Sequence, residues 1–393
     1  MNTSSPTNLL FAAVRAASKH LLLVFLCWLP LAALAVEQNH GFTESQMQQG
    51  EWWNIPYPQP FDSQKLSEPQ PWLQVQGNKL VDERGEVVQL RGVNIADPDK
   101  LYTEGQWRES LFAELADWGV TGVRIPIHPL AWRKRGGDWY LERLDEAVVW
   151  ANAHGMYLIV DWHSIGNLLT EQYQHPMYRT SMVETVRFWR SVALRYAQTP
   201  TVAVYELFNE PTDDYIGTGS GSLGRASWQQ WREAMESLID VVRLYNPRAI
   251  PLVAGFNWAY DLTPVADAPI RREGIAYAVH PYPQKAKPKV KSREQFNALW
   301  QQQWGFAAEK YPLIATEMGW VREDGYGAHV PVIHNEGTYG PDILAFLDAR
   351  DISWSAWVFD PDWSPTMIEG WSFKPTEQGA FFKKAMLRAR AGD

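Results

Sequence analysis

Short apolar runs rich in β-branched side chains recur eight times between residues 89 and 359. Most of these runs are separated by segments whose apolar positions lie three and four residues apart, for example residues 111–118, 144–151 and 228–242. Such runs predict buried strands, and the longer spacing predicts amphipathic helices. The predicted strands are residues 89–95, 122–128, 157–163, 203–209, 250–256, 274–281, 313–320 and 353–359.

The order of these elements predicts the fold. Strands that alternate with helices favour a parallel sheet, and eight such units favour closure into a (β/α)₈ TIM barrel. The chain of 393 residues is long enough for one barrel of this kind. Ahead of the first strand, residues 73–88 carry apolar pairs separated by Gly and Asp. We therefore predict a short N-terminal β-hairpin that closes the bottom of the barrel.

The first 35 residues have the pattern of an export signal. Arg15 and Lys19 precede an apolar stretch that ends in Ala33-Leu34-Ala35, a small-residue pattern that a signal peptidase accepts. An uncleaved anchor is the alternative, although the stretch is short for a membrane span. We predict a periplasmic or secreted protein with no stable membrane span after processing. The only cysteine, Cys27, lies within this stretch, so the processed chain would contain no disulfide.

Residues 36–70 are rich in Gln, Pro and Ser without a sustained period, which predicts an extended strap or linker ahead of a catalytic domain at 71–393. The net charge of −9 would repel phosphate backbones, so nucleic acid is excluded as a partner. The 21 Trp residues offer flat apolar faces that suit sugar rings, although we expect about half of them to fill the core. We expect a monomer.

Polar and aromatic side chains gather where the predicted strands end. In a TIM barrel this edge carries the active site. The residues concerned are Arg124, His128, Asp161, His163, Asn209, Glu210, His280, Tyr282, Glu317 and Trp357. Because a carboxylate among apolar residues is costly unless it is paired, Glu210 and Glu317 indicate a site of paired catalytic acids.

Seven short motifs lie on or directly after these strands. They are LRGVN at 90–94, GVRIP at 122–126, DWH at 161–163, LFNEP at 207–211, HPY at 280–282, TEMG at 316–319 and WSAW at 354–357. Together they make the chain resemble glycoside hydrolase family 5, the cellulase family of retaining TIM-barrel enzymes. The resemblance runs from about residue 89 to residue 359, and no member of the catalytic set is missing.

The resemblance implies roles for the two glutamates. Glu210 would be the acid and later the base, and Glu317 the nucleophile, with the two carboxyl groups about 5 to 5.5 Å apart. We expect the surroundings of Glu210, including the charge of Glu317, to raise its pKa. Arg124 and a hydrogen bond from Tyr282 would favour the charged form of Glu317.

The resemblance also implies a supporting set around the sugar. Asn209 would hold the 2-hydroxyl, Trp357 would form the floor, and His163 and His280 would bind hydroxyls or orient the carboxylates. The chemistry requires no metal and no cofactor. A metal at Asp360 and Asp362 is a disfavoured alternative, because these residues lack a closed ligand spacing.

Several other residues keep two interpretations. Glu206 is expected to face a helix or a buried partner, and Asp161 to be a structural hydrogen-bond partner. His128 either lines a subsite or caps its strand. Four tryptophans in loops after strands either stack against sugar units or pack in the core: Trp132, Trp258, Trp320 and Trp363.

The leading functional hypothesis is an exported endo-β-1,4-glucanase. Because subsites and not the carboxylates set sugar identity, a hydrolase of mannan, xyloglucan or a bacterial exopolysaccharide is a second hypothesis. A catalytically silent carbohydrate-binding barrel is the third, and the presence of both glutamates with Arg124, Asn209 and Tyr282 argues against it.

Overall fold

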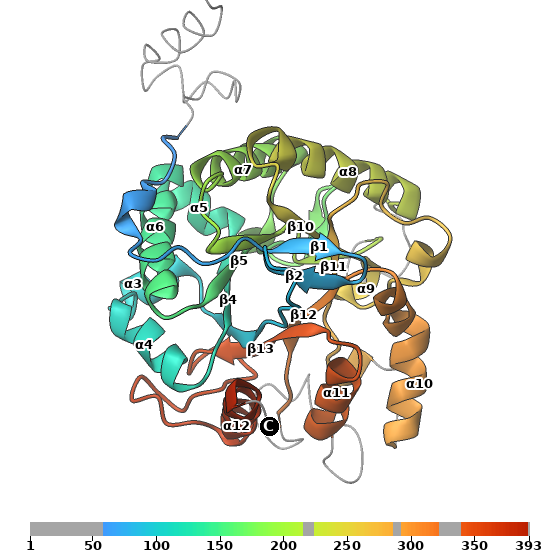
Figure 1. The fold of residues 1–393 in the computed structure, drawn as a ribbon. Coiled ribbons are helices and arrows are strands. Elements are labelled where there is room, and N and C mark those ends of the chain that lie inside the picture. Colours follow the sequence, from blue (N-terminus) through green and yellow to red (C-terminus); the bar gives the residue numbers. More distant parts are fainter. Residues whose placement is uncertain (1–57, 215–223, 286–291, 322–338, 392–393) are drawn as a thin grey trace, which may run out of the picture. The chain divides into compact units, whose positions relative to one another are not determined.

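The structure, a computed structural model, describes residues 58–214, 224–285, 292–321 and 339–391. Eight parallel strands close into a barrel with the neighbour order β10, β11, β12, β13, β3, β4, β5 and β8. Figure 1 looks along this barrel, with the helices in a ring outside it. The predicted TIM barrel is confirmed, and each predicted strand is present. The barrel strands are β3 (Arg91–Ile95), β4 (Gly122–Ile127), β5 (Tyr157–Trp162), β8 (Val202–Glu206), β10 (Ile250–Ala254), β11 (Ala276–Val279), β12 (Leu313–Met318) and β13 (Ser353–Phe359).

Amphipathic helices cover the outside of the barrel. In α8, the Ser227 and Gln230 side chains form a capping box at the N-terminus, and the residues at helical spacing from Trp231 to Val242 are buried. The helices in the described residues are α3 (Pro98–Thr103), α4 (Glu109–Asp117), α5 (Pro129–Arg135), α6 (Gly137–Ala153), α7 (Met182–Arg195), α8 (Trp228–Tyr245), α9 (Phe256–Ala259), α10 (Arg293–Gln303), α11 (Tyr339–Asp348) and α12 (Glu377–Ala391).

Alternation along the strands separates an outer core from the barrel interior. Val123 and Ile125 of β4 belong to the outer core, whereas Arg124 between them bonds to side chains from other barrel strands. On β5, Ile159 joins a smaller apolar cluster inside the barrel, and Asp161 lies two residues further on the same face. The interior is therefore apolar at one end and charged at the other.

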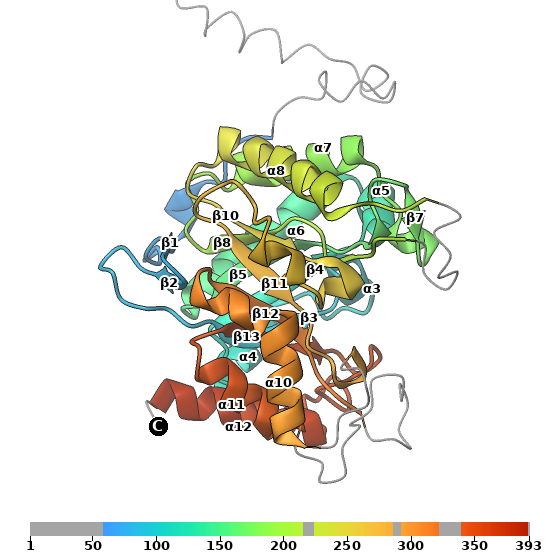
Figure 2. The same ribbon diagram turned by 90° about the vertical axis from the view of Figure 1, so that its right-hand side faces the viewer.

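The predicted hairpin lies at the apolar end. β1 (Gln74–Gln76) pairs antiparallel with β2 (Lys79–Val81), and Leu73 and Leu80 belong to the apolar cluster inside the barrel. Figure 2 shows this hairpin at one end of the barrel and α5 at the other.

The strap is described only from residue 58 onward. Within 58–70 the one regular element is a 3₁₀ turn, η3 (Ser63–Lys65). The Phe61 amide donates to the Arg195 carbonyl at 2.7 Å and Gln70 Nε2 to the Met156 carbonyl at 2.5 Å, so this segment is bonded to the barrel domain. The predicted export signal at 1–35 and the rest of the strap lie outside the described residues. Among the described helices, none combines the length and the apolar character that crossing a membrane requires.

Candidate active site

The fourth barrel strand ends earlier than predicted, and this changes how Glu210 is held. β8 ends at Glu206, because beyond it Leu207 and Phe208 turn into the outer core. Glu210 stands on a separate short strand, β9 (Glu210–Pro211), which pairs with β6 (Ile165–Asn167) after β5. A third short strand, β7 (Gln172–Tyr173), completes this small sheet. Glu210 therefore belongs to the loop layer above the barrel.

Arg124 is the centre of a buried ionic network inside the barrel. Its guanidinium donates to Glu206 at 2.6 Å and to Glu317 at 2.9 Å, and lies 3.0 Å from Asp161. Burial alone would lower the pKa of Arg124, but the three carboxylates outweigh it and raise that pKa well above its usual range. Glu206 faces these partners inside the barrel, so the prediction of a buried partner is confirmed. The prediction that Asp161 is a structural partner is also confirmed, since it bonds to His163 Nδ1 at 2.6 Å.

Two asparagines complete the shell around Arg124. Asn94, at the end of β3, accepts a hydrogen bond from the guanidinium at 2.8 Å and donates to the Thr316 carbonyl at 2.8 Å. Asn209 Oδ1 accepts another at 2.6 Å. Its Nδ2 is buried and has no hydrogen-bond partner within the described part of the chain. That amide nitrogen remains available to donate to a ligand.

Glu317 is held from the barrel strands. The β12–β13 register shifts between Ala315 and Met318, and both Thr316 and Glu317 bond to groups inside the barrel. The predicted contacts with Arg124 at 2.9 Å and with the Tyr282 hydroxyl at 3.0 Å are confirmed. Burial nevertheless raises the pKa of Glu317, and His280 and Arg124 offset only part of that rise.

Glu210 is held by two nitrogen donors on a single oxygen. His280 Nδ1 lies 3.0 Å and Lys285 Nζ 3.1 Å from Glu210 Oε1. Burial favours the neutral carboxyl, but Lys285 and His280 outweigh it and lower the pKa of Glu210 to about 2. The prediction that its surroundings raise this pKa is therefore wrong for the structure, because sequence reasoning did not include Lys285.

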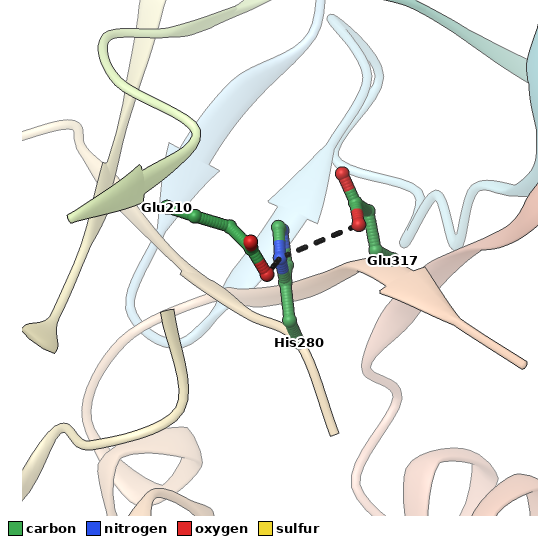
Figure 3. Close-up of side chains that lie close together, drawn as sticks. All are labelled: Glu210, His280 and Glu317. Carbon is green, nitrogen blue, oxygen red and sulfur yellow. Dashed lines mark hydrogen bonds and ion pairs between the residues drawn. The ribbon is translucent and has the colours of Figure 1, made fainter. Parts of the chain in front are cut away.

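His280 brings the two glutamates together. Its Nδ1 lies 3.0 Å from Glu210 Oε1 and 3.7 Å from Glu317 Oε2, so the ring stands between the carboxylates, as Figure 3 shows. One oxygen of each glutamate and a ring nitrogen all lie within 4.8 Å of one another. Burial disfavours the imidazolium, but the surrounding carboxylates outweigh burial and raise the pKa of His280.

The two glutamates face a cavity of about 420 Å³. Its lining combines carboxylates, aromatic rings and amides: His163, Ile165, Gln174, Tyr178, Glu210, Asn257, Trp258, Tyr282, Gln284, Lys285, Glu317, Trp357, Ser364 and Pro365. The Trp357 indole stacks on the His163 ring at 5.5 Å and 7°. All eight predicted site residues thus lie at one place: five line the cavity, Arg124 and His280 bond to the two glutamates, and Asn209 bonds to Arg124.

The four tryptophans that were predicted in loops divide between the site and the core. Trp258 lines the cavity, and Trp363 stacks on Trp357 at 6.0 Å and 8°. Trp132 packs on Phe188, and Trp320 packs on Phe381 and Phe382. Seven others are fully buried: Trp118, Trp162, Trp189, Trp231, Trp300, Trp304 and Trp354.

His128 has a structural position. Its ring and amide nitrogens both bond to Asp97, at 2.9 and 2.8 Å, and it precedes the first turn of α5. It is not among the residues that line the cavity. His128 therefore follows the end of β4 without lining the cavity, which fits the alternative of a residue at the strand end better than that of a subsite residue.

Among the residues that the structure describes, two groups have the spacing of metal ligands. The first is Glu104, Asp360 and Asp362, which all pair with Lys100, at 2.8, 2.7 and 3.0 Å, so a metal ion would have to displace its ammonium. The second group is Glu210, His280 and Glu317. There Lys285 and Arg124 bond to the carboxylates, and a metal ion would have to compete with both cations.

Asn94, Glu206 and Lys285 bond to the predicted site residues but were not predicted as members of the site. Asn94 ends a motif on the first strand, and Glu206 lies on the fourth strand with the right period, so both carried a signal. Lys285 carried none, since it follows the sixth strand in a segment with other lysines at 287, 289 and 291.

The chain is similar to known enzymes of one family. The model of the cellulase family, glycosyl hydrolase family 5, matches residues 81–362. The solved structure of a β-glucanase from Saccharophagus degradans is 57% identical, covers 86% of this chain and 99% of its own, and superimposes with a TM-score of 0.82. The same enzyme was also solved in complex with cellotetraose.

More distant relatives are endoglucanases. The one from Paenibacillus polymyxa is 25% identical over 77% of this chain and 83% of its own length. Endoglucanase E-5 from Thermobifida fusca is 27% identical over 74% of this chain, but the match spans only 56% of that protein. The family model covers well over half of the chain, which therefore belongs to the cellulase family, glycosyl hydrolase family 5.

Proposed function

We propose that this protein is a retaining endo-β-glucanase whose substrate is a β-1,4-linked glucan. The observation that carries the proposal is the approach of the two carboxylates, whose nearest oxygens lie within 4.8 Å. Retaining glycosidases hold their carboxyl groups about 5–5.5 Å apart, whereas inverting enzymes need about 6.5–9.5 Å to admit a water molecule. The β-glucanase and endoglucanase relatives support the substrate class.

In the first step, Glu317 attacks the anomeric carbon while the bond to the departing oxygen breaks. Glu210 gives its proton to that oxygen, and a glycosyl ester forms on Glu317. Arg124 and the Tyr282 hydroxyl stabilise the charge of Glu317 before attack. The unpaired Nδ2 of Asn209 would donate to the sugar 2-hydroxyl, a contact that strengthens in the transition state.

In the second step, water cleaves the ester. Glu210, now ionised, takes a proton from the water, which attacks the same carbon from the opposite side to Glu317. Two inversions return the original configuration. Trp357 lines the cavity with its indole stacked on His163, and we assign it as the floor beneath the reacting sugar.

Hydrolysis of a polysaccharide panel tests this proposal. We expect carboxymethyl cellulose and mixed-linkage β-glucan to lose viscosity faster than reducing ends accumulate, and mannan and xyloglucan to react far more slowly. Proton NMR of an oligosaccharide digest should show the β-anomer first. An α-anomer first would contradict retention, and preferential cleavage of mannan would contradict the substrate.

We also propose export, on the strength of the sequence at residues 1–35. N-terminal sequencing of the protein recovered from a bacterial host should begin at or near Val36. Recovery of the whole chain, still beginning at Met1, would contradict this.

A further inference from the structure

Lys285 has the position of a functional group rather than a surface lysine. It ends the 3₁₀ turn η6 (Pro283–Lys285), and its side chain is only 10% exposed. The ammonium donates to Glu210 Oε1 at 3.1 Å and also to the Trp258 carbonyl. It lies 5.5 Å from the centroid of the Tyr282 ring. Three partners therefore fix its charge inside the cavity.

The hydrogen bonds to Glu210 determine which oxygen can reach a substrate. Both His280 and Lys285 bond to Oε1. Within the described residues, no side-chain bond to Oε2 accompanies them. The carboxyl is therefore fixed with Oε2 as the oxygen that can meet a glycosidic oxygen in the cavity.

The position of Lys285 opposes the first catalytic step and favours the second. An ammonium at 3.1 Å stabilises the carboxylate. Glycosylation needs Glu210 protonated, whereas hydrolysis of the glycosyl ester needs it ionised.

Once Lys285 is removed, other charged and titratable groups around Glu210 determine whether its carboxyl is protonated. They are His280 and Tyr282 after β11, Glu317 on β12, Arg124 on β4, Asp161 on β5 and Tyr178 in the turn η4 (Pro176–Tyr178). Arg124 is already shared among three carboxylates. Without Lys285, burial and the negative charge of Glu317 would favour the neutral form of Glu210. His280 would be the remaining hydrogen-bonded group that favours its charged form.

We propose that Lys285 is the positioning residue that sets the protonation state of Glu210. It holds Oε1 and keeps the carboxyl ionised, and it must withdraw when a leaving group enters, so that Glu210 can take a proton from solvent and act as the acid. The catalytic part of this proposal rests on the proposed function. The electrostatic part can be measured without any turnover.

The test compares wild type with Lys285→Met and Lys285→Arg, using Lys374→Met as a control because Lys374 pairs with Glu369 far out on the surface. The first readout is the ¹³C titration of glutamate carboxyls in the labelled protein alone, with Glu210 assigned by its absence in Glu210→Gln. We expect the midpoint of Glu210 to rise by about one pH unit or more in Lys285→Met, a tenfold change in proton affinity, and to stay low in Lys285→Arg and Lys374→Met.

The second readout is the pH profile. On cellotetraose, the alkaline limb of kcat/KM should move to higher pH in Lys285→Met, because that limb reports the acid form of Glu210. An aryl cellobioside with a good leaving group needs no acid in the first step, so its alkaline limb should not move. A purely structural role would lower the rates of Lys285→Met on both substrates without moving either limb.

An unchanged midpoint of Glu210 in Lys285→Met would overturn the proposal. A midpoint that also rises in Lys285→Arg would overturn it, since the positive charge is then not the cause. If the midpoint moves as expected but the wild type cleaves neither β-glucans nor the aryl glycoside, the proposed function fails, and with it the catalytic role of Lys285.

Discussion

The two glutamates of the site are held in different ways. Glu317 lies on a barrel strand, and its partner Arg124 lies on another barrel strand. Glu210 lies above the barrel on a two-residue strand, and its cationic partner Lys285 ends a short turn. We call these the strand-held half and the loop-held half of the site.

The difference shows in the charge balance. In the strand-held half, one guanidinium serves three buried carboxylates, and burial raises the pKa of Glu317. In the loop-held half, Lys285 and His280 both serve Glu210, and its pKa falls to about 2. The strand-held half is therefore short of positive charge, while the loop-held half has an additional cation, Lys285.

The largest expected effect is the loss of the nucleophile. Glu317→Gln keeps the size of the side chain but cannot form the glycosyl ester, so kcat on β-glucan should fall by about 10⁴-fold or more. Binding of cellotetraose, measured by calorimetry, should persist. Glu369→Gln on the surface is the matched control. Activity within tenfold of wild type would remove Glu317 from the mechanism.

Truncation of Glu210 should lower activity less than loss of Glu317, and the size of the decrease should depend on the substrate. Glu210→Ala should lower kcat/KM on β-glucan by about 10²–10⁴-fold, but much less on an aryl cellobioside with a good leaving group. Added azide should restore turnover of that substrate and yield the β-glycosyl azide. An α-glycosyl azide, or equal losses on both substrates, would argue against the acid/base role.

Loss of the cation should lower the free energy of unfolding more in the strand-held half than in the loop-held half. Arg124→Met leaves three buried carboxylates without their partner and should lower the free energy of unfolding by about 3–5 kcal/mol. Lys285→Met should cost less, because its partner borders the cavity and can be solvated. Denaturant unfolding measures both, with the exposed Arg84→Met as control. Equal losses for Arg124→Met and Lys285→Met would remove the distinction between the halves.

The smallest expected effect is a difference in how the two glutamates make the stability of the fold depend on pH. The pKa of Glu210 is lowered from 4.5 to about 2, so its stabilisation is complete above pH 4.5 and is lost as the pH falls toward 2. The pKa of Glu317 is raised, so its contribution is complete below 4.5 and is lost as the pH rises.

Unfolding measured from about pH 2 to about pH 7 separates the two contributions. The stability advantage of wild type over Glu210→Gln should grow from about pH 2 to pH 4.5 and then stay level. The advantage over Glu317→Gln should instead shrink as the pH rises above 4.5. Parallel pH slopes for the two variants would contradict the opposite shifts.

The strand-held half could be predicted from the sequence because periodicity encodes it. Apolar runs located the barrel strands, and the rule that polar groups gather at strand ends identified Arg124, Tyr282 and Glu317 together. The contacts among them follow from closure of the barrel. Glu206 had the correct period but no visible partner, because Thr316 and Arg124 reach it from strands far away in the chain.

The loop-held half could be predicted only in part. The motif at 207–211 located Glu210, but the end of β8 was placed three residues too late, since Leu207 and Phe208 continue the apolar run while leaving the barrel. The position of Lys285 depends on the direction of a turn, which the periodicity of the sequence does not encode. The charge state of Glu210 could not be inferred without that lysine.

Trapping the glycosyl ester would identify the nucleophile directly. A 2-deoxy-2-fluoro cellobiosyl fluoride slows hydrolysis of the ester, so incubation should add one fluoroglycosyl unit to the intact mass, and peptide mapping should place it on Glu317. Lys285→Met should form the same adduct, since the fluoride leaves without an acid. An adduct on Glu210 or elsewhere, or no adduct while the products appear with inverted configuration, would contradict the central claim that Glu317 attacks a sugar held between the two carboxylates.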